Sequence, residues 1–175
     1  MLATAGSGGP MTPILLSRML HKLAFVAPGG TSLRPWLHRR RGVRLGSGVF
    51  IAQLVYIDEL HPDEVSIGDN STIGLRTSIF AHFYFGPRQA SGNGPVVIER
   101  DVFIGPNCVI LPNVTIGEGS VIRAGTVVSR SVPPRTLWGP PPAGPLGTVS
   151  VPLTHEHSYE EFARSIRPHR PPKRP

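Results

Sequence analysis

The sequence predicts an all-β fold in which the chain coils around a narrow aliphatic core, and three observations support this. Gly and Pro supply 20 residues each of the 175, and both disfavour helix interiors. Aromatic residues make up only 7% of the chain and charged residues 17%. An aliphatic residue also recurs every six positions through the middle of the chain. Neither an amphipathic helix nor a simple strand alternation has this period.

The six-residue rhythm defines twelve blocks, each beginning with Leu, Ile or Val. The blocks begin at residues 45, 51, 57, 67, 73, 79, 98, 104, 110, 116, 122 and 128. The fifth position is small or β-branched in ten of them. We expect the first residue to point into the axis of a triangular prism, the fifth to fit near a corner, and Gly, Asn or Asp at positions two to four to form the turn. Three faces make a coil of about 18 residues, and stacked coils pair as parallel ladders.

The Ile-Gly-x-x-x blocks resemble the hexapeptide-repeat acyltransferases, over residues 43–143 and most densely over 96–134. The resemblance implies a left-handed parallel β-helix and a homotrimer with its active sites between subunits. It also implies acetyl transfer from acetyl-CoA to a hydroxyl or amino group of a sugar or polysaccharide precursor, with no metal. A non-catalytic β-helix that binds sugars or acts as a scaffold is the alternative.

The repeat also predicts the organisation of the chain. We expect a disordered leader at 1–10, an N-terminal helical cap at 11–42, the β-helix at 43–134 with a protruding loop at 85–97, a C-terminal cap segment at 135–167 and a disordered basic tail at 168–175. Apolar residues at nearly helical spacing within 12–27 predict a helix that covers the open first coil. A second short helix is expected at 158–164, packing on a neighbour.

Two interruptions of the rhythm bear on function. The four residues around Asp63–Ser66 are interpreted as a corner irregularity. The Gly- and Pro-rich stretch 85–97 is interpreted as a loop standing off the prism, where functional groups concentrate. His82 lies just before this loop, and the family resemblance implies that it is the general base for the acceptor hydroxyl. The alternative is a histidine that fills a corner or bonds a backbone carbonyl.

The same resemblance implies the other site residues. The donor is expected to contact late coils at Gly105, Asn107, Arg123, Ala124, Gly125 and Arg130. The acceptor is expected to contact Tyr84, Arg88, His61 and Asp58. Each of these has an ordinary turn or surface residue as its alternative, and the repeat holds only two histidines, which is too few for a three-histidine zinc site. Cys108 is expected to be a buried small side chain, and Trp138 covers either the cofactor groove or the end of the core.

The net charge of +7 is concentrated towards the two ends. The early cluster comprises Arg34, Arg39, Arg40, Arg41 and Arg44, and the late one Arg164, Arg167, Arg170, Lys173 and Arg174. This distribution argues against a nucleic-acid partner, and we expect these charges to be solvated. A membrane-surface contact by Trp36, Leu37 and the arginine run is the alternative. No apolar run is long enough to span a bilayer and no secretory signal is evident, so a cytoplasmic location is expected.

Overall fold

The structure is a computed structural model that describes residues 14–82, 94–140, 147–152 and 158–168 of the 175. The chain divides into two compact units, Met1–Gly139 and Pro140–Pro175. Each unit is described by itself below.

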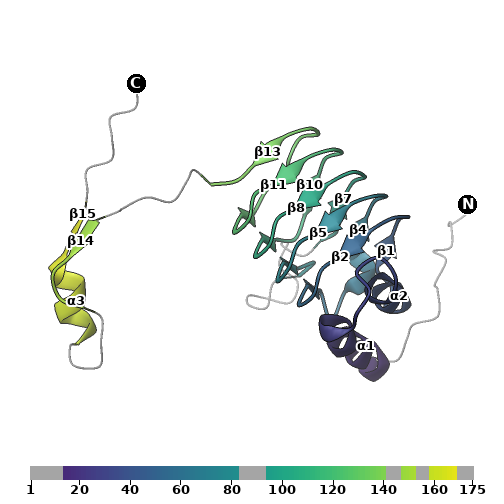
Figure 1. The fold of residues 1–175 in the computed structure, drawn as a ribbon, viewed down its shortest axis with the longest axis horizontal. Helices are drawn as coiled ribbons and strands as arrows, with labels where there is room; N and C mark the ends of the chain where they lie inside the picture. The colour runs from purple at the N-terminus through teal and green to yellow at the C-terminus, as the bar shows by residue number, and fades with distance from the viewer. Residues whose placement is uncertain (1–13, 83–93, 141–146, 153–157, 169–175) are drawn as a thin grey trace, which may run out of the picture. The chain divides into compact units, whose positions relative to one another are not determined.

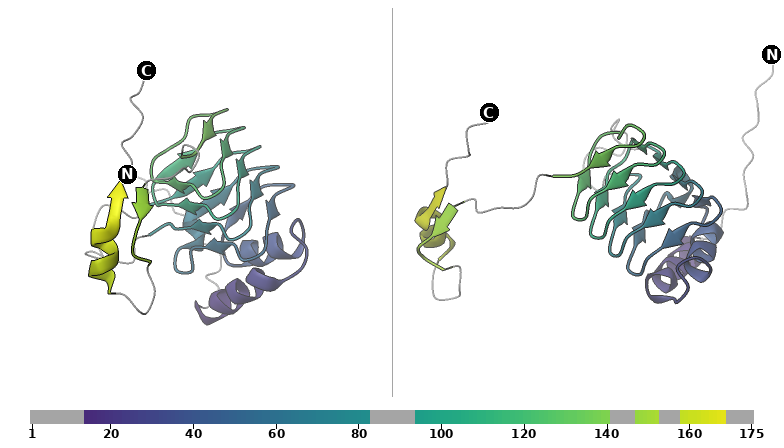
Figure 2. Two further views of the ribbon diagram at one scale, coloured as in Figure 1. Left: turned by 60° about the vertical axis from the view of Figure 1, so that its left-hand side comes forward. Right: turned by 45° about the horizontal axis from the view of Figure 1, so that its top comes forward.

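The first unit is a stack of triangular coils whose three faces are parallel sheets (Figures 1 and 2). Sheet A contains β1 (Arg44–Leu45), β4 (Val65–Ile67), β7 (Val96–Ile98) and β10 (Val114–Ile116). Sheet B contains β2 (Phe50–Ile51), β5 (Thr72–Ile73), β8 (Phe103–Ile104), β11 (Val121–Ile122) and β13 (Leu137–Trp138). Sheet C contains β3 (Tyr56–Ile57), β6 (Ser78–Ile79), β9 (Val109–Ile110) and β12 (Val127–Val128). The predicted left-handed parallel β-helix is confirmed.

Each position of the six-residue block has a defined structural role. The first residues of eleven of the twelve blocks are buried, and Leu45 is half-buried. The ten small or β-branched fifth residues are buried at the corners. The fourth position often adopts a left-handed φ, as at Asn107 (58°) and Gly125 (71°), which Asn and Gly tolerate best. A glycine at the second position allows close stacking, because a Cβ on Gly105 would lie 2.6 Å from the Ala124 nitrogen in the next coil.

The structure corrects two predicted boundaries. The β-helix continues four residues beyond the predicted end at 134, because β13 pairs in parallel with β11. The loop predicted to reach residue 97 ends earlier, because β7 begins at Val96. Trp138 packs against the aliphatic core, and the Arg130 guanidinium lies 5.2 Å from the centre of its ring. Of the two alternatives for Trp138, the structure therefore shows the one that covers the end of the core.

Two helices, α1 (Ile14–Val26) and α2 (Leu33–Arg40), lie at the end of the stack that begins with β1 and β2 (Figure 1). The predicted capping helix corresponds to α1, whereas α2 was not predicted. The expectation that the early arginines are solvated is wrong for Arg34 and Arg41, whose exposed fractions are 6% and 4%.

These arginines are buried because they satisfy the open edge of the first coil. The first strand of a parallel ladder has backbone groups with no preceding strand to pair with, and such buried groups need partners. In each of the three sheets, one carbonyl of the first coil accepts a hydrogen bond from a guanidinium: Leu45 from Arg39, Ile51 from Arg34 and Ile57 from Arg41.

The second unit holds a two-stranded antiparallel sheet of β14 (Gly147–Val149) and β15 (Ile166–Pro168), together with α3 (Tyr159–Ser165). Ser158 and Glu161 form a reciprocal capping box at the start of α3, a strong helix-initiating arrangement. The predicted C-terminal helix is thereby confirmed. Among the described residues, no helix is both long enough and apolar enough to cross a membrane.

The helical cap contains two fully buried histidines that make the stability of the protein sensitive to pH. Neither ring nitrogen of His21, nor Nε2 of His38, has a hydrogen-bond partner among the described residues. Burial and the nearby Arg41 charge lower the pKa of both imidazoles from 6.5 to about 3. Between these two values the unfolded chain binds protons that the native chain does not. The free energy of unfolding is thus expected to fall as the pH is lowered through this window, by up to about 1.4 kcal/mol per pH unit for each imidazole.

Urea denaturation at several pH values between neutral and 4 measures this dependence. His21→Leu is expected to reduce the slope by about one proton, because the leucine cannot be protonated in the unfolded chain. His61→Gln is the matched control, since His61 is exposed, and it should leave the slope unchanged. An unfolding free energy that stays constant from pH 6.5 to pH 4 in the native chain would contradict the assignment.

Candidate functional site

Both interruptions of the repeat leave the prism at the same corner, between sheets C and A. The first begins with Asp58 directly after β3 and includes the short 3₁₀ turn η1 (Pro62–Glu64) before β4. The second follows Ala81 and His82, and the described chain resumes at Gly94, whose N–H donates to the Ala81 carbonyl. Because Ile57 pairs with Ile79, the two interruptions lie on successive levels of this corner.

The stacking of these two levels brings Asp58 and His82 together. The Nδ1 atom of His82 lies 2.6 Å from Oδ2 of Asp58, and the N–H of Ala81 donates to the same oxygen at 2.8 Å. The other carboxylate oxygen accepts from the N–H groups of Leu60 (3.0 Å) and His61 (2.9 Å). Three backbone donors thus fix the carboxylate, and the carboxylate fixes the imidazole.

The hydrogen bonds also set the protonation state of Asp58. Burial alone would raise the pKa of the fully buried Asp58 carboxyl, but the bonds from the His61 and Ala81 backbone and from His82 lower it below its usual value. An ionised Asp58 accepts a hydrogen bond from the Nδ1–H of His82, so the lone pair of a neutral imidazole lies on Nε2. This arrangement prepares His82 Nε2 to accept a proton.

The acceptor-side predictions have different outcomes. Asp58 is 0% exposed and its carboxylate is bonded to His82, so the structure places it behind His82, and its contact with the acceptor stays a prediction. His61 is exposed, with its ring centre 5.3 Å from that of His82 in an edge-to-face arrangement, and it stays a candidate. Tyr84 and Arg88 lie outside the described residues.

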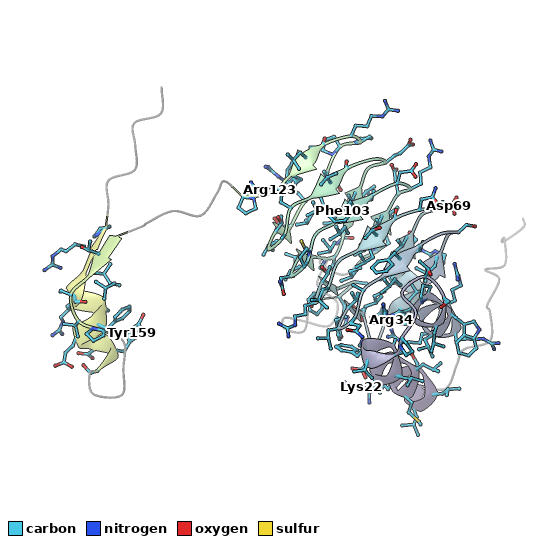
Figure 3. The ribbon with its side chains drawn as sticks, in the orientation of Figure 1. Lys22, Arg34, Asp69, Phe103, Arg123 and Tyr159 are labelled. Carbon is cyan, nitrogen blue, oxygen red and sulfur yellow. The ribbon has the colours of Figure 1, made fainter. Side chains whose placement is uncertain are left out.

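The donor-side predictions divide between two corners. Asn107, Arg123, Ala124 and Gly125 are exposed at the corner between sheets B and C, where Figure 3 labels Arg123. Gly105 belongs to the same corner, but it is buried. Its N–H donates to the Ile122 carbonyl (2.8 Å), and its own carbonyl accepts from the hydroxyl of Thr77 (3.1 Å). The backbone groups of Gly105 are thus used to stack coils, and its cofactor contact stays a prediction.

Arg130 follows β12, at the corner that also carries His82, and its guanidinium covers Trp138. Arg130 apart, the exposed donor-side candidates and His82 consequently lie at opposite ends of the sheet C strands. A single chain does not bring them together. Cys108 is fully buried, and burial raises the pKa of its thiol, which agrees with the predicted packing role.

The helical cap is connected directly to this site. The Arg41 guanidinium donates to the Asp58 carbonyl at 2.7 Å as well as to that of Ile57. Burial lowers the pKa of Arg41 to about 10, so the side chain stays cationic at neutral pH. The cation therefore lies behind Asp58 and helps to fix its backbone. Sequence reasoning missed this contact because the arginine run was assigned to solvent.

Comparisons with known proteins identify a family model and relatives of this chain. Residues 95–130 match the family model described as bacterial transferase hexapeptide (six repeats). The chain is 37% identical to the "Putative acetyltransferase YvoF" of Bacillus subtilis over 134 residues, which cover 76% of this chain and 73% of that protein. It is 38% identical to the "Putative acetyltransferase C18B11.09c" of Schizosaccharomyces pombe over 90 residues, 49% of this chain and 44% of that protein.

Solved structures give the same picture. A hexapeptide-repeat containing acetyltransferase of Vibrio cholerae, complexed with acetyl coenzyme A, superposes with a TM-score of 0.53 at 28% identity, covering 69% of this chain and 78% of that one. A maltose O-acetyltransferase of Clostridium difficile superposes with a TM-score of 0.50 at 22% identity, covering 67% of this chain and 76% of that one. The second likeness concerns the fold alone.

Proposed function

The chain belongs to the hexapeptide-repeat acetyltransferases, and we propose that it transfers the acetyl group of acetyl-CoA to a hydroxyl or amino group of a sugar or polysaccharide precursor. The Asp58–His82 pair carries this proposal. An imidazole held by a buried, ionised carboxylate is the group that an alcohol needs for deprotonation near neutral pH.

In the proposed reaction, Nε2 of His82 takes the proton of the acceptor hydroxyl as its oxygen attacks the thioester carbonyl. Asp58 stabilises the resulting imidazolium through the Nδ1–H bond. Backbone N–H groups near the corner hold the developing oxyanion. Collapse breaks the carbon–sulfur bond, and His82 returns its proton to the sulfur of CoA. The carbon–oxygen bond replaces the carbon–sulfur bond, so no covalent intermediate on the protein is required.

The division of the candidate residues between two corners supports a site made by two copies of the chain. We propose a homotrimer in which His82 of one subunit faces the corner of the next subunit that carries Asn107, Arg123, Ala124 and Gly125. Small residues there allow a pantetheine arm to approach the backbone, and Arg123 supplies positive charge for the phosphates. His61 lies on the acceptor side of His82. A CoA donor and a buried, reduced cysteine are consistent with a cytoplasmic location.

Acceptor-dependent release of CoA tests the activity. The full chain is incubated with acetyl-CoA and a thiol-reactive dye in the presence of single sugars, disaccharides and nucleotide sugars. At least one acceptor is expected to raise CoA release well above the acceptor-free rate, with the acetylated sugar detected by mass spectrometry. Sugar binding in calorimetry with no acetylated product for any acceptor would favour the non-catalytic β-helix instead.

A further inference from the structure

Helix α1 exposes most of its large apolar side chains. Among its described side chains, those packed most deeply against the protein are Ser17, His21 and Ala24. The outer face carries five large apolar side chains, which we call the α1 stripe. Their exposed fractions are 71% for Leu15, 45% for Leu16, 62% for Met19, 51% for Leu23 and 66% for Val26.

The spacing makes the stripe continuous. Leu15, Met19, Leu23 and Val26 follow one another at intervals of four, four and three, which places them on one side of a helix, and Leu16 extends this side. A helix on the surface of a globular protein normally has the opposite orientation, with its apolar face inward. A continuous exposed apolar surface rimmed by polar groups marks an interaction site.

The charges around the stripe identify its partner. Residues 1–57 contain seven Lys and Arg residues and no Asp or Glu, and five of the seven are exposed. Lys22, labelled in Figure 3, is exposed on α1, and Arg18 is half-exposed, 3.6 Å from Glu59. On α2, the guanidinium of Arg40 lies 5.0 Å from the ring centre of Trp36, which is 46% exposed. The cap therefore presents cations, aliphatic groups and one indole, a combination suited to the interface of an anionic bilayer.

We infer that the α1 stripe docks the protein on the surface of an anionic lipid bilayer. A two-fold contact between two copies of the same surface would place Arg18 and Lys22 near their counterparts, and like charges oppose such a contact. An anionic headgroup layer pairs with those cations and receives the apolar side chains to a depth of about 5–10 Å. This inference does not depend on the proposed acetyl transfer.

Co-sedimentation of the full chain with lipid vesicles tests the inference. We expect binding to vesicles that contain phosphatidylglycerol, little binding to pure phosphatidylcholine, and a loss of binding as salt is raised. The triple variant Leu15→Ser, Met19→Ser, Leu23→Ser is expected to reduce the partition coefficient by at least about tenfold. Lys22→Gln is expected to reduce it about fivefold. Leu137→Ser is the matched control: Leu137 is also 71% exposed but lies on β13, and its replacement should change nothing.

Three outcomes would overturn the inference. The first is no binding of the native chain to anionic vesicles at low salt. The second is undiminished binding by both the triple variant and Lys22→Gln, each with native helix content by circular dichroism. The third is a triple variant that dissociates the native assembly in sedimentation velocity, which would identify the stripe as a contact between copies. If the triple variant does not fold, the vesicle binding of Lys22→Gln tests the inference alone. This substitution should not disturb folding, because the Lys22 side chain is exposed.

Discussion

Replacing His82 with alanine is expected to lower kcat for acetyl transfer by about 10²–10⁴-fold. The variant removes the only group of the Asp58–His82 pair that can accept the proton of the acceptor. The KM for acetyl-CoA should change little, because the donor-side candidates lie at the other end of the sheet C strands. Steady-state CoA release with the best acceptor of the panel measures both constants. His82 is 7% exposed, so thermal melting of the variant verifies that the corner is intact.

His61→Ala is the control for this prediction. The ring of His61 is close to that of His82, but it has no contact with the Asp58 carboxylate other than through its backbone N–H. As an acceptor-side residue it should raise the KM for the acceptor without a comparable loss of kcat. Acetyl transfer that His82→Ala leaves intact would remove the proposed mechanism while leaving the family assignment unaffected.

Asp58→Asn is expected to lower kcat on the order of 10²-fold or more, because an amide does not hold the proton of His82 at Nδ1. It is also expected to lower the free energy of unfolding by about 1–3 kcal/mol. One end of the amide keeps an oxygen for the N–H groups of Leu60 and His61, but the other end then presents N–H groups to the N–H of Ala81. Kinetics and urea denaturation measure the two effects separately.

Asp63→Asn provides the matched comparison, since Asp63 is exposed at the same corner and the substitution removes the same charge. It should be neutral in both measurements. The pH dependence gives a further check on Asp58. Because the pKa of its carboxyl is lowered by folding, its contribution to stability is present above the unfolded value of about 4 and is lost as the pH falls through the lower native value. The unfolding free energy of Asp58→Asn should lack this loss at low pH. If it falls with pH in the acid range as steeply as that of the native chain, the assignment is contradicted.

The fold could be predicted from the sequence because one short code is repeated in every block. Each coil places the same kinds of side chain at the same positions, so a single period predicts the sheets, their register and the buried set. The register also places the corner of Asp58 one level from that of His82, and the position of His82 beside an interruption was readable from the sequence. The role of Asp58 needed atomic distances, because a carboxylate at a corner can face solvent or a neighbouring coil.

The parts that were not predicted depend on contacts distant in sequence. Helix α2 (LRPWLHRR) has three charged or imidazole groups in its second half and little apolar periodicity. It is held by Arg34, which donates to the carbonyls of Ala27 and Ile51. Composition alone predicts that such arginines are solvated. The unpaired carbonyls to which their guanidinium groups donate exist only once the first coil has formed. The contact of Arg130 with Trp138 was not predicted either, because Trp138 is reached only through the stacking of coils.

The guanidinium groups at the first coil affect whether copies of this protein can polymerise end to end. A parallel β-helix with bare ends would add further molecules strand on strand and grow into fibres. Here the chain's own arginines occupy the acceptors of Leu45, Ile51 and Ile57, and charged side chains at the edge of a ladder oppose strand addition. Polymerisation from this end is therefore blocked at three points, one on each face, by residues that also stabilise the folded monomer.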